Sequence, residues 1–113
     1  MKLTGVIGAE KPSLSFEVFP PKTSTKYESV RAAAEGIAAL SPSYVSITYG
    51  AGGGTGDYTV SLAAGIREKY DLPVLAHLTC VNSSREGVQK QLRSMRAAGI
   101  DNVLALRGDL APG

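Results

Sequence analysis

The stretch SFEVFPPKT, residues 15–23, decides the fold because it joins a strand pattern to a charge and an abrupt end. Phe16 and Val18 alternate with Glu17, and this alternation predicts a β-strand with one apolar and one polar face. Pro20 begins a pair of prolines, and proline cannot donate a hydrogen bond to a sheet. The rest of the chain must explain why a strand carries a carboxylate on one face.

Hydrophobic periodicity predicts four strands that alternate with three helices. The expected strands are residues 14–19, 44–49, 74–79 and 102–107, and the expected helices are residues 25–40, 57–70 and 84–98. Thr25 and Ser83 each have a glutamate three residues later, which predicts capping boxes at two helix starts. Gly99 is typical of a helix C-terminus. Strands joined by helices favour parallel pairing with right-handed crossovers.

Each expected strand has an apolar face and a face that turns polar toward its C-terminal end. The polar faces hold Ser15 and Glu17, then Ser46 and Thr48, then His77 and Thr79, and finally Arg107 and Asp109, while Leu104 and Leu106 are assigned to the apolar face. A parallel sheet with helices on both sides would be apolar on both faces. In a barrel, one face meets the helices and the other surrounds a site at the C-terminal mouth.

The alternative is an open sheet in which Glu17 faces solvent. This alternative accounts for one strand with a polar face, but it accounts less well for four strands that share the same arrangement. We therefore predict an α/β fold, a (βα)3β half of a TIM-type (β/α)8 barrel with parallel strands. A whole barrel needs about 250 residues, and this chain has 113.

The composition is that of a globular protein, with 43% hydrophobic and 19% charged residues. The net charge of +2 is small and scattered, so no nucleic-acid partner is expected. No apolar run approaches the roughly 20 residues of a membrane span, so no membrane association is expected. Cys80 is the only cysteine, which favours a cytoplasmic location, and we expect it to be a small buried apolar residue.

Three further features suggest a site at the strand ends. The run YGAGGGTGDYT, residues 49–59, lies between a strand and a helix, where backbone N–H groups can bind phosphate, but it matches neither the dinucleotide nor the Walker pattern. His77 is the only histidine, so no metal site is expected, and its place on the inward face favours contact with a ligand over a structural role. Arg107 and Asp109 form either a salt bridge or two separate ligand contacts.

Four motifs together resemble the methylenetetrahydrofolate reductase family. SFEVFPPKT, VSITYGAGGGT, AHLTC and ALRGDLAPG occur in the order and at the spacing of that family. The resemblance covers nearly the whole chain, so residues 1–113 are expected to be the N-terminal part of a catalytic barrel domain that carries FAD.

The resemblance implies FAD-dependent reduction of 5,10-methylenetetrahydrofolate to 5-methyltetrahydrofolate with NAD(P)H, in one-carbon metabolism and methionine biosynthesis. It implies that Glu17 is the general acid that helps to open the folate ring; a buried carboxyl that holds a proton near neutral pH suits this task. Asp109 would stabilise a cationic intermediate and lie near the flavin. The residues implied to contact FAD are Thr48, His77, Leu106, Arg107 and Asp109.

A half barrel leaves its first and last strands without neighbours, so we expect self-association through these open edges. Two other functions stay open: a non-catalytic self-associating fragment, and a small phosphate- or nucleotide-binding module that uses the glycine run. We expect little or no turnover from the 113-residue chain alone, since half a cavity cannot enclose a flavin or exclude water from it.

Overall fold

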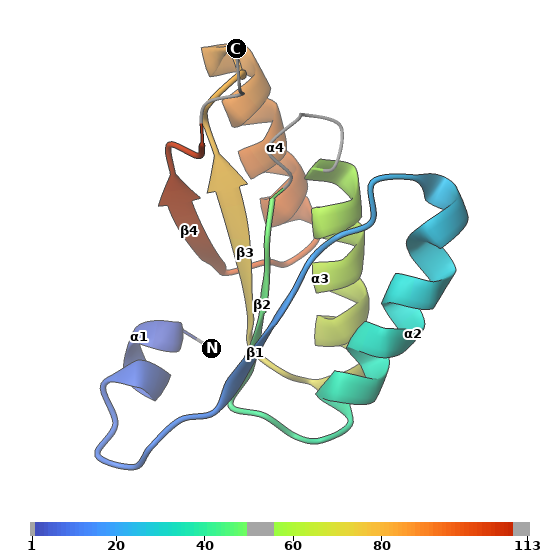
Figure 1. Ribbon diagram of the computed structural model, residues 1–113. Coiled ribbons are helices and arrows are strands. Elements are labelled where there is room, and N and C mark those ends of the chain that lie inside the picture. Colours follow the sequence, from blue (N-terminus) through green and yellow to red (C-terminus); the bar gives the residue numbers. More distant parts are fainter. Residues whose placement is uncertain (1, 50–55, 110–113) are drawn as a thin grey trace.

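The structure is a computed structural model that describes residues 2–49 and 56–109. Within these ranges the chain alternates between helices and strands (Figure 1). The elements are α1 (Leu3–Ile7), β1 (Ser15–Val18), the short 3-10 helix η1 (Ser24–Lys26), α2 (Tyr27–Ala38), β2 (Tyr44–Ile47), α3 (Gly56–Tyr70), β3 (Val74–Thr79), α4 (Arg85–Ala97) and β4 (Asn102–Leu106).

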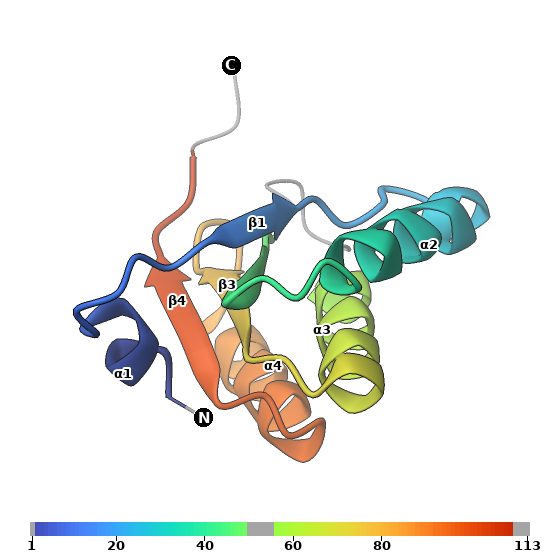
Figure 2. The ribbon, with the colours of Figure 1, turned by 90° about the horizontal axis from the view of Figure 1, so that it is seen from below.

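The strands form one parallel sheet in the order β1-β2-β3-β4, so each strand lies beside the next one in the sequence. Helices α2, α3 and α4 lie along one face of this sheet (Figure 2). The short α1 lies on the other side, near the N-terminal ends of the strands (Figures 1 and 2). The predicted α/β fold with parallel strands is confirmed.

The core lies between the sheet and α2, α3 and α4. Its buried residues are Val18, Val45, Ile47, Val74, Ala76 and Leu78 from the sheet, and Ala34, Ala38, Leu62, Ala63, Ile66 and Met95 from the helices, with Ile100 just before β4. Alternation in β1, β2 and β3 places these apolar side chains on one face, as predicted. The opposite face of the same strands carries most of their polar residues, together with Leu75 of β3.

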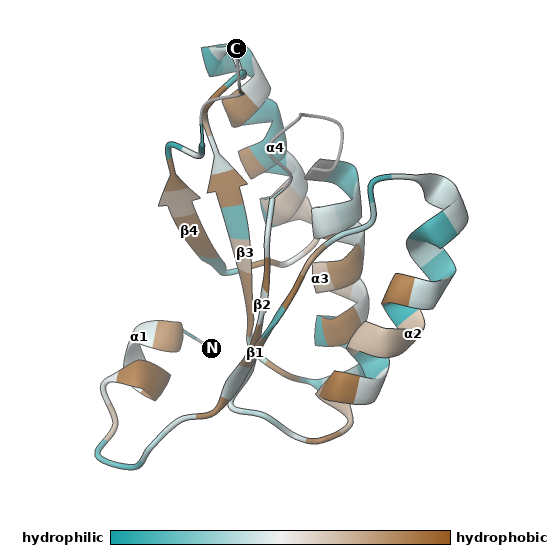
Figure 3. Cartoon of the chain, in the orientation of Figure 1, coloured by the Kyte–Doolittle hydropathy of each residue, from teal (hydrophilic) through white to brown (hydrophobic). Residues whose placement is uncertain are grey.

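The predicted faces of β4 were wrong. His77 is paired with Leu104 and Thr79 with Leu106, and paired residues of neighbouring strands point to the same side of a sheet. The two leucines therefore share the polar face, and Val103 is on the helix side. After Asn102 every residue of the strand is apolar (Figure 3), so alternation could not distinguish its faces.

The two predicted capping boxes were also wrong. Helix α4 is capped by Ser84, whose Oγ accepts a hydrogen bond from the Gly87 N–H at 3.0 Å, and not by Ser83. Thr25 lies inside η1, and the first residue of α2 follows without a side-chain cap. Gly99 follows the end of α4 with φ of 76°, the left-handed conformation expected there.

Helix α1 was not predicted from the sequence. Its Leu3 is buried, and the Leu3 N–H donates a hydrogen bond to Oδ1 of Asn102 at 2.9 Å. A helix of five residues has too little periodicity to be recognised in a sequence, and tertiary contacts hold it in place.

Candidate functional site

A cavity of about 320 Å³ lies at the C-terminal ends of β2, β3 and β4. It is lined by Thr48, Tyr49, His77, Thr79, Leu106, Arg107, Gly108 and Asp109. Two larger hollows lie elsewhere, one of about 370 Å³ at the opposite ends of β3 and β4 and one of about 430 Å³ between α2 and α3. Neither contains a residue of the predicted site, so the chemistry points to the smaller cavity.

The backbone of Thr48 is fixed from two sides at the end of β2. Its N–H donates to the Val18 carbonyl of β1 at 3.0 Å. Its carbonyl accepts a hydrogen bond from the hydroxyl of Thr59, a fully buried residue of α3, at 2.9 Å. No sequence pattern indicated this role of Thr59, because a threonine within a helix usually faces solvent or its own backbone.

The turn after β3 and the segment after β4 hold each other by backbone hydrogen bonds. The Cys80 N–H donates to the Leu106 carbonyl at 3.1 Å, and the Val81 N–H donates to the Arg107 carbonyl at 2.8 Å. These bonds continue the pairing of β3 with β4 past the end of the sheet. The segment that carries Leu106 and Arg107, which line the cavity, is therefore anchored to β3.

Gly108 bends the chain at the cavity. Its φ is 87°, and a Cβ added there would lie 2.9 Å from Cβ of Thr79. Nε of Arg107 donates to the Gly108 carbonyl at 3.1 Å, and no ion pair joins Arg107 to Asp109, both of which are described residues. Of the two alternatives for these charges, the salt bridge is not formed, and the separate ligand contacts stay a prediction.

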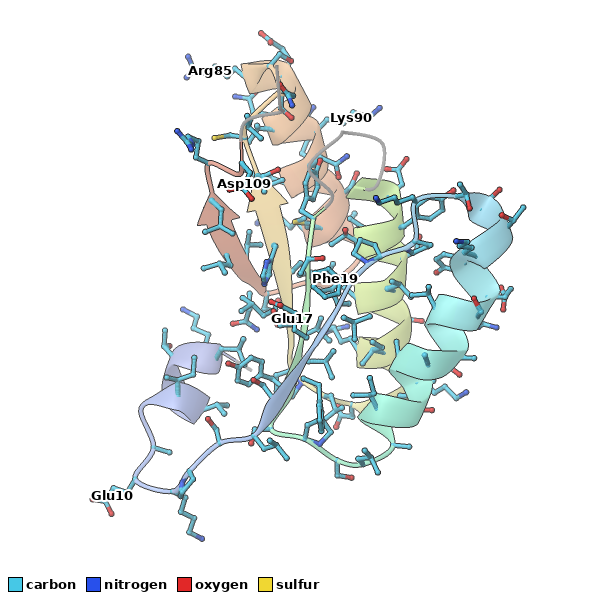
Figure 4. The ribbon with its side chains drawn as sticks, viewed as in Figure 1. Glu10, Glu17, Phe19, Arg85, Lys90 and Asp109 are labelled. Atoms are coloured by element: carbon cyan, nitrogen blue, oxygen red, sulfur yellow. The ribbon has the colours of Figure 1, made fainter. Side chains whose placement is uncertain are left out.

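Glu17, Ser46 and His77 meet on the polar face of neighbouring strands. Oγ of Ser46 lies 2.6 Å from Nε2 of His77, and Oε1 of Glu17 lies 3.7 Å from the same nitrogen. The His77 side chain is 12% exposed and the Glu17 side chain is 51% exposed. The expectation of a buried Glu17 was wrong for this chain, because no described helix packs over this part of the polar face (Figure 4).

The structure brings the predicted flavin-contacting residues to one place. All five line the cavity: Thr48, His77, Leu106, Arg107 and Asp109. Glu17 does not line it; in Figure 4 it lies lower on the sheet, while Asp109 lies near the ends of β3 and β4. The link between Glu17 and the cavity is the imidazole of His77.

Tyr49 lines the cavity but was not predicted as a site residue. Burial raises the pKa of its phenol, and the negative charge of Asp57 raises this pKa further. The phenol is therefore neutral at physiological pH and can donate a hydrogen bond into the cavity.

Other expectations from the sequence have different outcomes. Cys80 is exposed, so its predicted burial was wrong; it follows the last residue of β3 and lies beyond the packed part of the sheet. The glycine run falls largely on residues 50–55, outside the described residues. Across the described part of the chain, no helix is long and apolar enough to cross a membrane, and no cluster of three or more His, Cys, Asp or Glu residues is arranged to hold a metal ion.

Comparison with known proteins gives a family match over almost the whole chain. The sequence model of the family described as methylenetetrahydrofolate reductase matches residues 2–113. The chain is 40% identical over 101 residues to 5,10-methylenetetrahydrofolate reductase of Salmonella typhimurium and 38% identical over 101 residues to that of Escherichia coli. It is 37% identical over 108 residues to methylenetetrahydrofolate reductase (NADH) 1 of Arabidopsis thaliana.

These alignments cover most of this chain but a smaller part of each relative. They include 89% of the chain and 34% of the length of each bacterial relative. For the Arabidopsis protein the shares are 96% and 18%. The chain thus spans about a third of the length of the bacterial relatives it matches.

Proposed function

Since the chain belongs to the methylenetetrahydrofolate reductase family, we propose that it forms the N-terminal part of a (β/α)8 catalytic barrel. The whole enzyme would reduce 5,10-methylenetetrahydrofolate to 5-methyltetrahydrofolate, with FAD as cofactor and NAD(P)H as electron donor. We place this enzyme in the cytoplasm. The four parallel strands with helices on one face support the barrel, because a barrel has this arrangement throughout.

The observation that carries the proposal is the cavity at the C-terminal strand ends. Active sites of (β/α)8 enzymes lie at this end of the strands. Residues from three different strand ends, Thr48, His77 and Asp109 among them, line one hollow. The same strands are apolar on the face that meets the helices, so the polar groups are concentrated at this place.

The residues of the cavity fit one edge of a flavin ring. A flavin presents carbonyl oxygens and bare ring nitrogens, which need hydrogen-bond donors, and one ring N–H, which needs an acceptor. Thr48, Tyr49, His77 and Arg107 offer such donors, and Leu106 offers an apolar contact. The volume of about 320 Å³ is at the lower limit for a ligand pocket, so these residues would hold part of the cofactor and not all of it.

In this proposal, the residues that line the cavity would hold FAD, which would supply hydride transfer between NAD(P)H and the folate. Glu17 would act as the general acid that donates a proton as the folate ring opens. Asp109 would stabilise positive charge that develops on the substrate. Arg107 and Thr48 orient the cofactor, and Leu106 excludes water from one side.

Glu17→Gln in a full-length enzyme tests the acid role. We expect reduction of the flavin by NAD(P)H to stay within about twofold, because that half-reaction needs no proton from Glu17. Folate reduction should slow by about 10²- to 10⁴-fold, the usual contribution of a general acid. Stopped-flow absorbance of the flavin measures both half-reactions, and equal losses in both would contradict the role.

For the 113-residue chain alone we expect little or no turnover. The cavity is open, and Glu17 is half exposed, so water would compete with each contact. A flavin absorption spectrum in the purified chain, or quenching of FAD fluorescence on titration, would show retained cofactor binding. If the chain binds no FAD even at millimolar FAD concentration, the proposed activity belongs only to a longer enzyme.

A further inference from the structure

Two side chains, one from β1 and one from β2, converge on one nitrogen of His77 in β3. Glu17 is paired with Ser46 across β1 and β2, and both lie on the same face of the sheet as His77. The hydroxyl of Ser46 is within hydrogen-bond distance of Nε2, and the carboxylate of Glu17 is the next polar group, at 3.7 Å. Ser46 is only 7% exposed, so its hydroxyl is held in this position.

The charge of Glu17 decides which form of the neutral imidazole is favourable. An imidazole nitrogen either carries a hydrogen and donates, or presents a lone pair and accepts. When Glu17 is ionised, its oxygens only accept, so an Nε2–H faces two acceptors. A bare Nε2 would instead direct its lone pair toward a carboxylate, which is unfavourable.

A neutral Glu17 removes this repulsion. The buried hydroxyl of Ser46 then gains by donating its hydrogen to Nε2, because a buried donor without an acceptor is costly. The imidazole hydrogen moves to Nδ1 in that form. Because Ser46 occupies the Nε2 edge, Nδ1 is the nitrogen left for a group bound in the cavity that His77 lines.

We propose that Ser46 is a positioning residue that couples the protonation of Glu17 to the tautomer of His77. His77 then offers Nδ1 to the cavity as an acceptor while Glu17 is ionised and as a donor once Glu17 is neutral. A ligand with an N–H or O–H group next to His77 suits the first state, and a ligand with a carbonyl oxygen or bare ring nitrogen suits the second. The other titratable or charged groups around the cavity are Tyr49, Arg107 and Asp109.

The functional meaning of this coupling rests on the proposed acid role of Glu17, but the tautomer can be measured without any ligand. His77 is the only histidine in the sequence, so two nitrogen resonances report on it without assignment by mutation. Long-range ¹H–¹⁵N spectra of the labelled chain are recorded at rising pH until the two ¹⁵N shifts of the ring no longer change. These limiting shifts belong to the neutral imidazole and give the tautomer ratio.

Glu17→Gln replaces the carboxylate by a neutral group of the same size. We expect it to raise the ratio of the Nδ1–H to the Nε2–H form by about three- to tenfold, the effect of one hydrogen bond of ordinary strength. In a Ser46→Ala background the same change should alter the ratio by less than about twofold. Glu10→Gln and Ser61→Ala, at exposed positions outside the site, are the matched controls and should leave the ratio unchanged.

An unchanged ratio in Glu17→Gln overturns the coupling, and an equal response with and without the Ser46 hydroxyl overturns the positioning role. If Ser46→Ala does not fold, Ser46→Cys replaces it, because cysteine has a similar volume and is a weaker hydrogen-bond donor. Glu17→Gln changes a half-exposed residue, so this variant should fold and still tests the coupling. A tautomer change together with normal folate reduction in full-length Glu17→Gln would keep this inference and remove the acid role. Loss of folate reduction without a tautomer change would do the reverse.

Discussion

Gly108 and Gly36 differ in what a methyl group would meet. At Gly108, a Cβ would lie 2.7 Å from Cγ1 of Val81, and the φ of 87° is unfavourable for other residues. At Gly36, inside α2, nothing lies within 4 Å. We expect Gly108→Ala to lower the free energy of unfolding by about 1–3 kcal/mol and Gly36→Ala to raise it by about 0.5–1 kcal/mol. Urea unfolding measures both; the same sign for both variants would contradict the geometry at Gly108.

Tyr49 makes stability sensitive to alkaline pH. Its pKa is raised in the folded chain, so the folded state holds the phenolic proton more tightly than the unfolded state. This contribution is complete below the unfolded pKa of about 10 and is lost as the pH rises through the folded pKa. Tyr49→Phe should therefore weaken the fall in unfolding free energy above about pH 10. Identical alkaline profiles for Tyr49→Phe and the unchanged chain would contradict burial as the cause.

Single-residue roles differ in how far the sequence could predict them. Strand alternation and the motif order predicted that Thr48, His77 and Asp109 belong together, and they line one cavity. The contact between Ser46 and His77 depends on the register of two strands separated in sequence, which no local pattern encodes. The exposure of Glu17 depends on what covers the sheet face, which is a property of the tertiary structure.

At the level of elements, the start of α4 offers a test of helix capping. Ser84 has an extended backbone and accepts the Gly87 N–H, whereas the adjacent Ser83 does not cap the helix. Ser84→Ala should lower the free energy of unfolding by about 1 kcal/mol, within a usual range of about 0.5–2 kcal/mol, because a backbone N–H loses its partner. Ser83→Ala should change it by less than about 0.5 kcal/mol. Chemical denaturation distinguishes them, and a larger loss for Ser83→Ala would restore the capping box predicted from the sequence.

Element positions were more predictable than element ends and faces. The bounds of β3 were predicted correctly because proline precedes it and its alternation is complete. The cap of α4 was mispredicted because the motif selects Ser83, three residues before Glu86, whereas the backbone conformation makes Ser84 the N-cap. The prediction of the two faces of β4 was wrong because nearly every residue in the strand is apolar.

At the level of the whole molecule, β4 has an exposed apolar surface at the edge of the sheet. Within the described residues it pairs only with β3, and Val103, Leu104 and Leu106 are 36%, 39% and 42% exposed. We expect the 113-residue chain to self-associate through this edge, because an unpaired apolar strand is a template for another chain. Leu104→Lys should weaken the association by about tenfold or more, and Leu40→Lys, at an exposed leucine after α2, should not. Sedimentation velocity over a range of concentrations measures this; a monomer throughout would remove the idea.

The neighbour-to-neighbour strand order also bears on how the chain acquires its structure. Because each strand after β1 pairs with the one that precedes it, each new β-strand can dock as soon as it leaves the ribosome. The hydrogen bond from Leu3 to Asn102 is the exception, since it joins residues 99 positions apart. Helix α1 would therefore dock only after β4 has been synthesised, and its docking would be the last step in the folding of this part of the protein.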